Sequence, residues 1–522
     1  MRSCFFVLVC TCLFHYAAEA QANYLDTLYR PYDFAWDLNY GNTLKLNDTS
    51  YVITGYGLTM QNHFIFNLFA INLKGDTLWD KSYDFGSKDL FAAYKAVLDN
   101  DKNILIAGPF FNDSLQGYQA MLFKTDSMGN KKWLKTYGIS HYGHYQGLFA
   151  YVPIATIDRH YLIASTLGID SVNADFLVIK TDTNGNEESR WQYGTPKYET
   201  LWAGIQAIDS GFIFAGETTV SDTPDFYTFS IYTMKVDKNG NELWKAIYAS
   251  PYDTTNNRHI TDAVTNDVIE DTDGYVFVGH RYSRRNYVLH SSPFAYLKAW
   301  VAKLDKQTGH IIWEQNIGIN NATYQRFYKI TKTSDGGYAA CGIQAFSNQN
   351  TTNDSWLVKT NTFGDSIWSR RFYYANDTSL ETEFYSITQT YDDGYLISGF
   401  AYDYNGDPFP WVIITDSMGC LIPGCDTLTV NDIKVLPDDK VGVVIYPNPA
   451  SNVAYILIKS DIDVLDLSFR IYALTGQIVT TKTSAITDVT YLLNTSNFAK
   501  GVYLVDVMSQ GKVVTTRRLV KE

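Results

Sequence analysis

Four residues in one stretch of the chain, Arg281, Arg284, Arg285 and Tyr287, combine positive charge with an aromatic ring. Guanidinium groups form paired hydrogen bonds with carboxylates, and tyrosine rings offer an apolar surface with a polar tip. The stretch is therefore a candidate for binding an acidic glycan or the carboxylates of a protein partner. The alternative is a solvated insertion without a ligand, because long surface loops cost little free energy.

Two histidines, His141 and His144, stand three residues apart, which on a helix would let both reach one metal ion. A glycine lies between them in an expected loop, so we predict no metal site and no cofactor. Repeated Asp-Gly pairs lack the alternating acidic residues and the closing glutamate of a calcium loop, and are interpreted as turn formers. These pairs are Asp273-Gly274, Asp335-Gly336 and Asp393-Gly394.

Three of the six cysteines, Cys341, Cys420 and Cys425, lie outside the first twelve residues. Cys341 belongs to an apolar run and is expected to be buried. Cys420 and Cys425 flank Leu-Ile-Pro-Gly, and in an exported protein such a pair can close a small loop by a disulfide. Two free thiols are the alternative. No second Cys or His pair follows at a ligand's distance, so zinc is not predicted.

Motifs for known catalytic chemistry are missing from the sequence. It contains no Gly-x-Ser-x-Gly, no His-Glu-x-x-His and no phosphate-binding glycine loop, so no catalytic residue is predicted. Paired carboxylates for glycoside cleavage remain open, because they can come from distant loops. The net charge of -13 over 522 residues argues against nucleic acid or an anionic membrane as the main partner.

A sequence repeat predicts the strands and turns that position these residues. Close copies of the segment Lys124–Trp133 recur along most of the chain, each with a glycine before a tryptophan. Each copy indicates a strand, a tight turn in which glycine takes a positive φ, and a second strand carrying the tryptophan. The tryptophans are Trp79, Trp133, Trp191, Trp244, Trp313 and Trp368.

A full period adds two more strands, one of which is bounded by a glycine such as Gly399 and occurs seven times. The tryptophan strand occurs six times, and Asp26–Tyr29 matches the residues around Trp79 at the other end of the repeat. A closed ring of sheets needs its first and last sheets joined. The sequence therefore predicts an all-β fold, a seven-bladed β-propeller over residues 24–420, closed by an N-terminal strand.

In this fold the tryptophan strand is the outermost of each blade, and its indole packs between adjacent blades. Eight blades would need a further repeat, and the repeats of a β-solenoid are usually shorter than these periods of roughly 53 to 69 residues. The connections after the tryptophan strand and after the glycine-bounded strand are long and emerge on one side. We call this side the long-loop face and expect binding there. Its longest connection, 279–300, contains Arg281.

The two ends of the chain differ from the repeat. Residues 1–20 have the charged start, apolar core and small-x-small end of a secretory signal peptide, and no later stretch is apolar enough to span a bilayer. Residues 421–442 are polar and are interpreted as a linker. Short alternating runs over 443–522 predict a small Ig-like β-sandwich, with one of its strands at 478–481.

One copy of the repeat, Val301–Trp313, resembles the tryptophan-docking motif of pyrroloquinoline-quinone-type propellers. The resemblance implies the fold and not the chemistry. Those enzymes place adjacent cysteines by the cofactor and hold a calcium ion, and residues 21–522 contain no Cys-Cys pair. Neither a quinone nor a metal is therefore carried over, and an oxidoreductase is disfavoured.

Residues 443–522 resemble the type A C-terminal sorting domain of proteins exported by the type IX secretion system of Gram-negative bacteria. The matching segments are Tyr446–Pro449, Ile471–Gln477, Leu493–Tyr503 and Gly511–Val520, with Phe498 where the family usually has leucine. The resemblance implies recognition by the outer-membrane translocon and a secreted or surface location. In the family the tail is commonly cleaved, and the passenger is released or fixed to surface lipopolysaccharide.

Two functional hypotheses follow. The preferred one is a secreted or surface-displayed propeller that binds a glycan or protein through the long-loop face. The alternative is an extracellular degradative enzyme, a glycosidase or lyase, with carboxylates on the same face.

Overall fold

The structure is a computed structural model of the whole chain. It describes residues 26–28, 34–59, 64–84, 95–112, 117–138, 151–169, 173–219, 229–248, 263–282, 297–319, 322–346, 353–374, 378–404, 406, 408–421, 441–446, 448–460, 467–473, 478–479, 483–487, 490–509 and 512–521. The predicted signal peptide lies outside the described residues, as does nearly all of the predicted linker.

The described strands fall into an N-terminal unit, β1 to β28, and a C-terminal unit, β29 to β35, which share no sheet. The strands of the N-terminal unit are β1 (Asp26–Leu28), β2 (Phe34–Lys45), β3 (Ser50–Thr59), β4 (Phe64–Asn72), β5 (Thr77–Asp84), β6 (Lys95–Leu98), β7 (Ile104–Asn112), β8 (Gly117–Thr125), β9 (Lys131–Tyr137), β10 (Tyr151–Ala155), β11 (Tyr161–Gly168), β12 (Ala174–Thr181), β13 (Glu187–Tyr193), β14 (Glu199–Gln206), β15 (Phe212–Thr219), β16 (Phe229–Val236), β17 (Glu242–Tyr248), β18 (Ala263–Glu270), β19 (Gly274–Tyr282), β20 (Leu297–Asp305), β21 (Ile311–Ile317), β22 (Ala322–Lys332), β23 (Tyr338–Phe346), β24 (Asn353–Thr360), β25 (Ser366–Phe372), β26 (Thr382–Gln389), β27 (Tyr395–Tyr402) and β28 (Pro408–Thr415).

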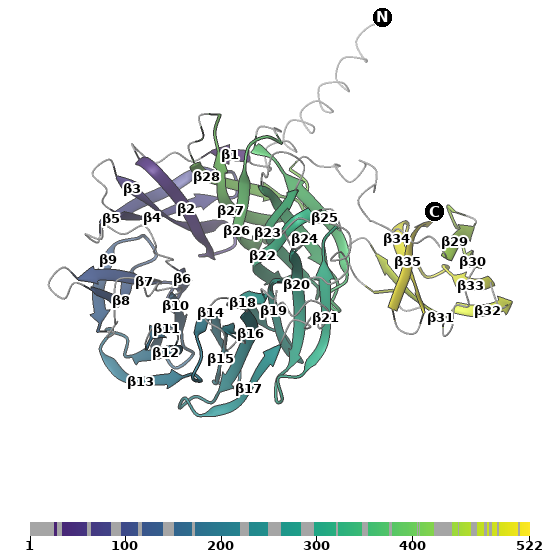
Figure 1. Cartoon of the computed structure of the whole chain (residues 1–522). Helices are drawn as coiled ribbons and strands as arrows, with labels where there is room; N and C mark the ends of the chain where they lie inside the picture. Colours follow the sequence, from purple (N-terminus) through teal and green to yellow (C-terminus); the bar gives the residue numbers. More distant parts are fainter. Residues whose placement is uncertain are drawn as a thin grey trace, which may run out of the picture. The chain divides into compact units, whose positions relative to one another are not determined.

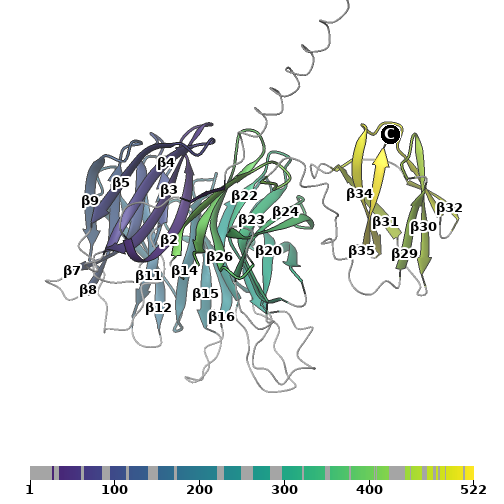
Figure 2. The same ribbon diagram turned by 90° about the horizontal axis from the view of Figure 1, so that it is seen from above.

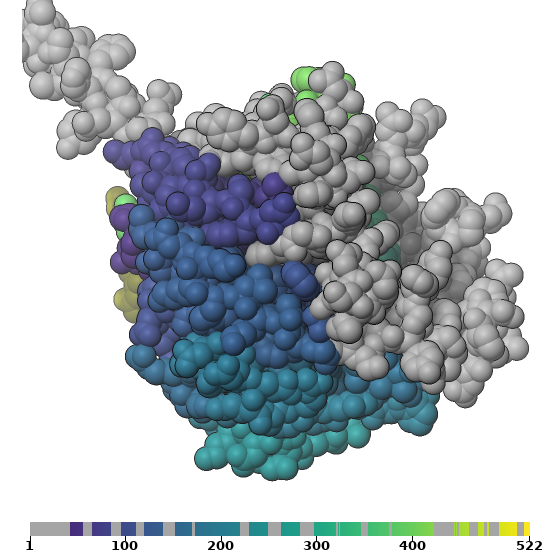
Figure 3. All heavy atoms as spheres, turned by 90° about the vertical axis from the view of Figure 1, so that its left-hand side faces the viewer, coloured from purple at the N-terminus to yellow at the C-terminus, as the bar shows by residue number. Residues whose placement is uncertain are grey.

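The strands β1 to β28 form seven antiparallel sheets of four strands among the described residues. Figure 1 shows these sheets arranged about a common centre, with β14, β18 and β22 toward the centre and β13, β17 and β21 at the periphery. We call this arrangement the ring, and the strand of each sheet nearest its centre the inner strand. Figure 2 shows the strands of these sheets running alongside one another. Segments that follow each other in the sequence, coloured from purple through blue to teal, lie side by side (Figure 3).

Burial differs between the inner and outer parts of each sheet. The third strand of one sheet, β20, has every residue but its last buried, because both of its faces pack against other sheets. The outer strand β13 alternates between exposed and half-buried residues. The apolar core therefore lies between neighbouring sheets. Because the core does not depend on the inner strands alone, these strands can include polar residues.

The first strand of the chain joins the last sheet of the ring. β1 pairs with β28 in an antiparallel register that sets Asp26 opposite Ile413 and Leu28 opposite Trp411. This strand supplies the fourth place in the sheet formed by β26, β27 and β28. The predicted pairing of the Asp26 segment with the last repeat is thus present. Tyr29, the predicted counterpart of the tryptophans, lies outside the described residues.

The repeated turn follows one hydrogen-bonding pattern. In the copy that begins at Asp126, the Oδ1 atom accepts hydrogen bonds from the backbone N–H groups of Met128 and Asn130, at 2.9 and 2.8 Å. Gly129 then adopts a φ of +76°, which favours glycine. The turn is therefore built by the aspartate side chain together with glycine, as its composition predicts.

The tryptophans of the repeat contact the turn of the next sheet, as predicted. A Cβ atom at Gly129 would lie 2.9 Å from Cζ3 of Trp79, and one at Gly185 would lie 2.9 Å from Cζ3 of Trp133. A tyrosine four residues after the tryptophan adds a hydrogen bond, since the hydroxyl of Tyr137 donates to the Gly185 carbonyl at 2.8 Å. The outer strands β5, β9, β13 and β17 are thereby fixed to the neighbouring sheet.

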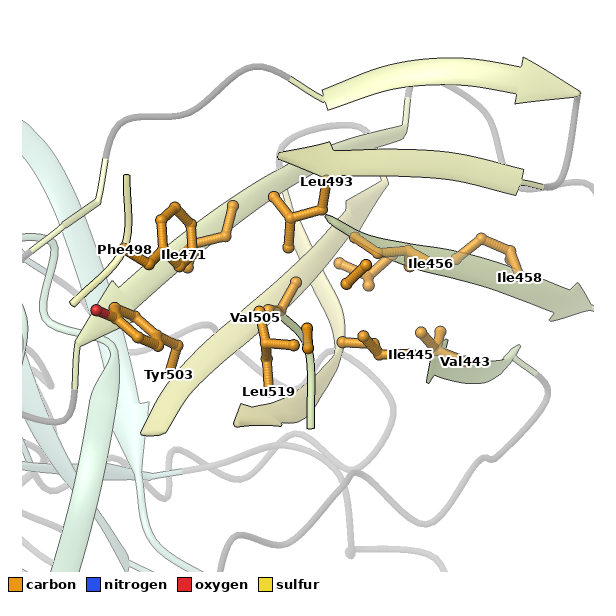
Figure 4. Packing of buried hydrophobic residues seen from close by; sticks show 13 residues of the cluster. Val443, Ile445, Ile456, Ile458, Ile471, Leu493, Phe498, Tyr503, Val505 and Leu519 are labelled. Atoms are coloured by element: carbon orange, nitrogen blue, oxygen red, sulfur yellow. The ribbon is translucent and has the colours of Figure 1, made fainter. Parts of the chain in front are cut away.

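The C-terminal unit consists of two antiparallel sheets around one apolar core. Its strands are β29 (Val441–Tyr446), β30 (Val453–Ser460), β31 (Leu467–Ala473), β32 (Thr483–Thr487), β33 (Thr490–Asn494), β34 (Gly501–Ser509) and β35 (Lys512–Lys521). One sheet has the order β29-β30-β33-β32 and the other β31-β34-β35. Figure 4 shows the side chains of both sheets meeting in the core, with Ile456 and Val505 fully buried. Of the strand expected at 478–481, Ile478 forms an isolated bridge with Tyr472, whereas residues 480–481 lie outside the described residues, so this strand stays a prediction.

Candidate functional site

Glycines in the second strand of four sheets hold the inner strand at very close range. A Cβ atom at Gly216 would stand 1.8 Å from the carbonyl oxygen of Thr200, and one at Gly399 would stand 1.8 Å from that of Glu383. Only glycine permits this approach between two backbones. The glycines are Gly216, Gly279, Gly342 and Gly399, and the carbonyls belong to Thr200, Val264, Arg326 and Glu383.

A β-bulge follows this contact in the inner strand. The pairing register between the two strands skips one residue, namely Trp202 in β14, Asn266 in β18 and Tyr385 in β26. Each stands two residues after the carbonyl that its glycine approaches, and Tyr328 in β22 stands at the same spacing. A bulge redirects the side chain of its extra residue. The glycine-bounded strand of the sequence repeat thus serves to produce these bulges.

The residues at these positions face one another from neighbouring inner strands. The rings of Tyr328 and Tyr385 have centroids 4.6 Å apart. Asn266 donates a hydrogen bond of 2.6 Å from Nδ2 to the carbonyl oxygen of Phe327. These contacts run from one inner strand to the next, so the bulges gather polar and aromatic groups around the centre of the ring.

We call Lys95, Trp202, Asp267 and Lys329 the lysine cluster. Lys95 donates a hydrogen bond of 2.5 Å from Nζ to the carbonyl oxygen of Trp202, although their sheets are not consecutive in the sequence. Lys329 forms an ion pair with Asp267, with 2.9 Å between Nζ and Oδ1. The second oxygen of Asp267 accepts a hydrogen bond of 3.1 Å from the backbone N–H of Ile330.

The two ammonium groups of the lysine cluster influence each other. The pKa of Lys95 is lowered from its ordinary value to about 8, chiefly by burial and in addition by repulsion from Lys329, while Asp267 acts in the opposite direction. Lys95 and Lys329 are both half-buried as whole residues. Asp267 is the carboxylate that the lysine cluster contains, and it is already paired with Lys329.

We call Tyr328, Asn353, Glu381, Glu383 and Tyr385 the carboxylate cluster. Asn353 donates from Nδ2 to the Oε1 atoms of both Glu381 and Glu383, each at 2.6 Å. The hydroxyl of Tyr385 donates to Oε2 of Glu383 at 2.6 Å, and that of Tyr328 does so at 3.4 Å. One amide thus holds two carboxylates together.

Both carboxylates of this cluster have raised pKa values. Burial is the main cause for Glu383, which is 7% exposed, and its hydrogen bonds oppose the rise. For Glu381 burial is again the largest cause, and the negative charge of Glu383 adds to it. Two carboxylates held this close disfavour simultaneous ionisation.

A guanidinium group lies beside the carboxylate cluster. The Arg326 guanidinium lies 4.8 Å from the ring centroid of Tyr324 and 5.5 Å from that of Tyr328. All three residues belong to β22 at alternate positions, so they share one face of that strand. The arginine also lowers the pKa of Glu383 against the effect of burial. The inner strand β22 therefore presents a stripe of aromatic and cationic side chains.

The carboxylate cluster lies toward the long-loop face. β24 begins at Asn353 after the connection from β23, and β26 begins at Thr382 after the connection from β25. These are the two kinds of connection that define this face. Sequence reasoning did not find the cluster, because its residues come from three strands and no short motif links them. The glycines of the second strands, which lie beside the bulges, were the available signal.

The predicted binding residues of the longest connection are only partly within the described residues. Arg281, near the end of β19, binds both carboxylate oxygens of Glu314 at 2.7 and 3.0 Å and donates to Asn316 at 3.1 Å. Its charge is therefore balanced within its own sheet. Arg284, Arg285 and Tyr287 lie outside the described residues, so a ligand at this segment stays a prediction.

The cysteines and histidines singled out by the sequence have separate outcomes. Cys420 is disulfide-bonded, whereas Cys425, its predicted partner, lies outside the described residues, so that pairing stays a prediction. Cys341 is a free and buried thiol. His141 and His144 also lie outside the described residues. Among the residues that are described, no three His, Cys, Asp or Glu side chains gather as metal ligands.

Two surface hollows lie on the opposite side of the ring, among the short turns. One is lined by Asp99, Lys124 and Tyr161 together with turn residues. Lys124 and Asp99 form an ion pair of 3.0 Å, and the Tyr161 hydroxyl donates to the same carboxylate at 3.0 Å. An equivalent arrangement recurs at Lys235, Asp209 and Tyr275. We therefore assign these groups to the scaffold of the repeat.

Residues 444–522 match the model of the secretion system C-terminal sorting domain family. The sorting domain predicted for this end of the chain is thereby confirmed. It indicates export by the type IX secretion system, interaction with that machinery and a secreted or cell-surface location. Within the described residues, no helix has the length and apolar character needed to cross a bilayer. No curated protein sequence matches the chain.

Several solved structures share an all-β, propeller-like arrangement with this chain. The crystal structure of polysaccharide lyase Uly1 has 12% identity and a TM-score of 0.41, and the match covers 76% of this chain and 95% of that chain. Drosophila Plexin A in complex with Semaphorin 1b has 10% identity, a TM-score of 0.40 and coverages of 75% and 88%. The β-propeller domain of the Trilobed protease from Pyrococcus furiosus has 10% identity, a TM-score of 0.37 and coverages of 72% and 93%. At these values the likeness carries no argument about function.

Proposed function

We propose that this chain is a secreted or cell-surface seven-bladed β-propeller that binds a glycan or a protein through its long-loop face. In this proposal residues 1–20 are a signal peptide, 24–420 the propeller, 421–442 a linker and 443–522 an Ig-like sorting domain. The seven four-stranded sheets of the described residues and the pairing of β1 with β28 support the closed propeller. The tryptophan contacts between sheets support the docking type of repeat.

The observation that carries the binding function is the cluster of rings and charges on the inner strands toward the long-loop face. The rings of Tyr328 and Tyr385 pack against each other at a tilt of 47°, and Arg326 lies over Tyr328. Aromatic rings beside hydrogen-bonding groups match the needs of a sugar, whose faces are apolar and whose edges are polar. These residues sit on strands, so they form a rigid site that the long connections of the same face can complete.

The binding function is tested with the purified chain on a glycan array and in a pull-down from host or environmental proteins. We expect retention of at least one ligand class, and loss of that retention when Tyr328 and Tyr385 are both changed to alanine. The matched control is Tyr391→Ala, which removes a tyrosine that is 61% exposed and lies in the short turn before β27. Equal retention by the double variant and the parent chain would contradict this assignment.

A degradative enzyme is the second candidate, and the carboxylate cluster favours it. The Oε1 atoms of Glu381 and Glu383 each lie 2.6 Å from one Nδ2 atom, so they cannot be more than twice that distance apart. Inverting glycosidases need about 6.5 to 9.5 Å between their carboxyl groups. The pair therefore fits only retaining glycoside cleavage, or a shared proton used in elimination.

The state of Glu383 argues for binding over catalysis. Its carboxylate accepts hydrogen bonds from Asn353 and Tyr385 and is buried, which leaves little room for a reacting sugar. A screen of neutral and acidic polysaccharides for new reducing ends or unsaturated products tests the alternative. Turnover by the parent chain that is abolished in both Glu381→Gln and Glu383→Gln would establish an enzyme and displace the binding proposal.

A further inference from the structure

The lysine cluster occupies one level of the ring. Lys95 and Asp267 each pair with the residue that precedes the glycine of the neighbouring strand. Lys329 stands three residues after Arg326, whose carbonyl is approached by Gly342. Asp267 likewise stands three residues after Val264, whose carbonyl is approached by Gly279. The repeat therefore places these three side chains at equivalent positions of three inner strands, β6, β18 and β22.

Other sheets fill or bridge this level with short polar side chains. The Oδ1 atom of Asn42 accepts a hydrogen bond of 2.7 Å from the backbone N–H of Ala96, and Oγ of Ser386 accepts one of 2.8 Å from that of Thr43. Each links its inner strand to the next one. A short hydrogen-bond acceptor is therefore sufficient to link two neighbouring inner strands. The long cationic side chain of Lys95 is not required for this link.

The charges of the lysine cluster do not balance. Two ammonium groups share Asp267, whose oxygens already bind Lys329 and the N–H of Ile330. Lys95 donates to the neutral carbonyl of Trp202 and forms an ion pair with none of the described carboxylates. Bringing two like charges into a half-buried space costs free energy, which an anion placed between them would recover.

We infer that the lysine cluster binds the anionic group of an acidic glycan at the centre of the ring, with Lys95 and Lys329 as its cationic ligands. This rests on the proposed binding function and names its ligand class. Both lysines are half-buried, so a small carboxylate or sulfate group can approach them more closely than the flat surface of a protein. Tyr328, next to Lys329 in β22, offers a ring for the sugar attached to that group.

The depressed pKa of Lys95 agrees with this assignment. A lysine with a pKa of about 8 remains mostly protonated at neutral pH, and a bound anion would raise its pKa toward the ordinary value. The charged groups that act on the pKa of Lys95 are Lys329 in β22 and Asp267 in β18. Affinity for the anion is therefore expected to fall as the pH rises through about 8.

The test measures binding of two acidic probes to the full chain by calorimetry at pH 7. The probes are hexagalacturonate, which carries carboxylates, and an oligomer of dextran sulfate, and the neutral comparison is fully methyl-esterified hexagalacturonate. We expect at least one acidic probe to bind and the ester not to. Lys95→Gln should weaken that binding at least tenfold, whereas Lys131→Gln, on the exposed part of outer strand β9, should leave it unchanged.

The outcomes separate this inference from the function on which it rests. Unchanged affinity in Lys95→Gln, or equal binding of the ester, overturns the lysine cluster as an anion site while the binding function stands. If neither acidic probe binds although the glycan array retains a neutral sugar, the inference is also overturned. Failure of every ligand on the array and in the pull-down rejects both. Thermal unfolding of Lys95→Gln, expected at the parent's temperature or above, excludes misfolding as the cause of lost binding.

Discussion

The indole of Trp244 lies against Gly309 of the next sheet so closely that a Cβ atom at the glycine would stand 2.7 Å from Cε3 of the ring. The indole N–H also donates a hydrogen bond of 3.0 Å to the carbonyl of Lys306 in the same turn. The same contact joins Gly129 to Trp79, Gly185 to Trp133 and Gly240 to Trp191, so in these copies the glycine of the turn makes room for the tryptophan of the preceding sheet.

Gly309→Ala is expected to destabilise the ring by about 1 to 3 kcal/mol, because the new methyl group overlaps Trp244 and the φ of +70° is strained for alanine. The measurement is the melting temperature of the N-terminal unit. Gly406→Ala is the matched control, since Gly406 has a φ of +80° but, its chain neighbours aside, no atom of the described residues lies within 4 Å of its Cβ position. The difference between the two variants isolates the overlap with the indole, and equal melting temperatures would contradict the packing argument.

Removal of residues 21–33 is expected to lower the melting temperature of the N-terminal unit by several degrees. The deletion takes away β1 and exposes the edge of β28, where Thr27 pairs with Val412. It should also increase aggregation, because an open strand edge can pair with another chain. Differential scanning calorimetry and light scattering provide the two measurements. An unchanged melting temperature would show that β1 does not close the ring.

The sequence predicted the scaffold because its determinants are local. Asp126, Gly129 and the tryptophan that follows them lie within one turn and one strand, so their spacing alone indicates the hairpin. The pairing of Asp26 with Ile413 could also be predicted, although the two are far apart, because a missing copy at one end matched an extra one at the other. The sequence repeat therefore made it possible to predict the long-range pairing of β1 with β28.

The inner surface of the ring could not be predicted in the same way. Lys95 and Trp202 meet only because the whole ring brings their strands together, and no sequence spacing encodes that distance. Of the basic stretch that contains Arg281, Arg284 and Arg285, only Arg281 is among the described residues, and its charge is balanced by Glu314. Charge and composition identify candidates, but only the fold shows which of them already have partners.

Deletion of residues 441–522 is expected to stop the chain from reaching the cell surface, because these residues contain the sorting domain. The truncated chain should accumulate in the periplasm after removal of the predicted signal peptide. Cell fractionation and immunoblotting measure this in a host with a type IX system. The control is Phe498→Leu, which restores the residue that the resemblance leads us to expect and should be exported normally. Surface delivery of the truncated chain would disprove the role of this domain.

Lys95 is expected to make the stability of the unliganded chain depend on pH in the alkaline range. Burial lowers its pKa in the folded chain from 10.5 to about 8, so between these two values the unfolded chain binds more protons than the folded one. The contribution of Lys95 to stability therefore increases as the pH rises from about 8 to 10.5, and is smallest below that window. Other groups titrate in this range as well, so the informative quantity is the melting temperature of the parent chain minus that of Lys95→Gln. This difference should become more positive as the pH rises from about 8 to 10.5. Parallel curves of melting temperature against pH for the two proteins would show that the position of Lys95 in the ring does not lower its pKa.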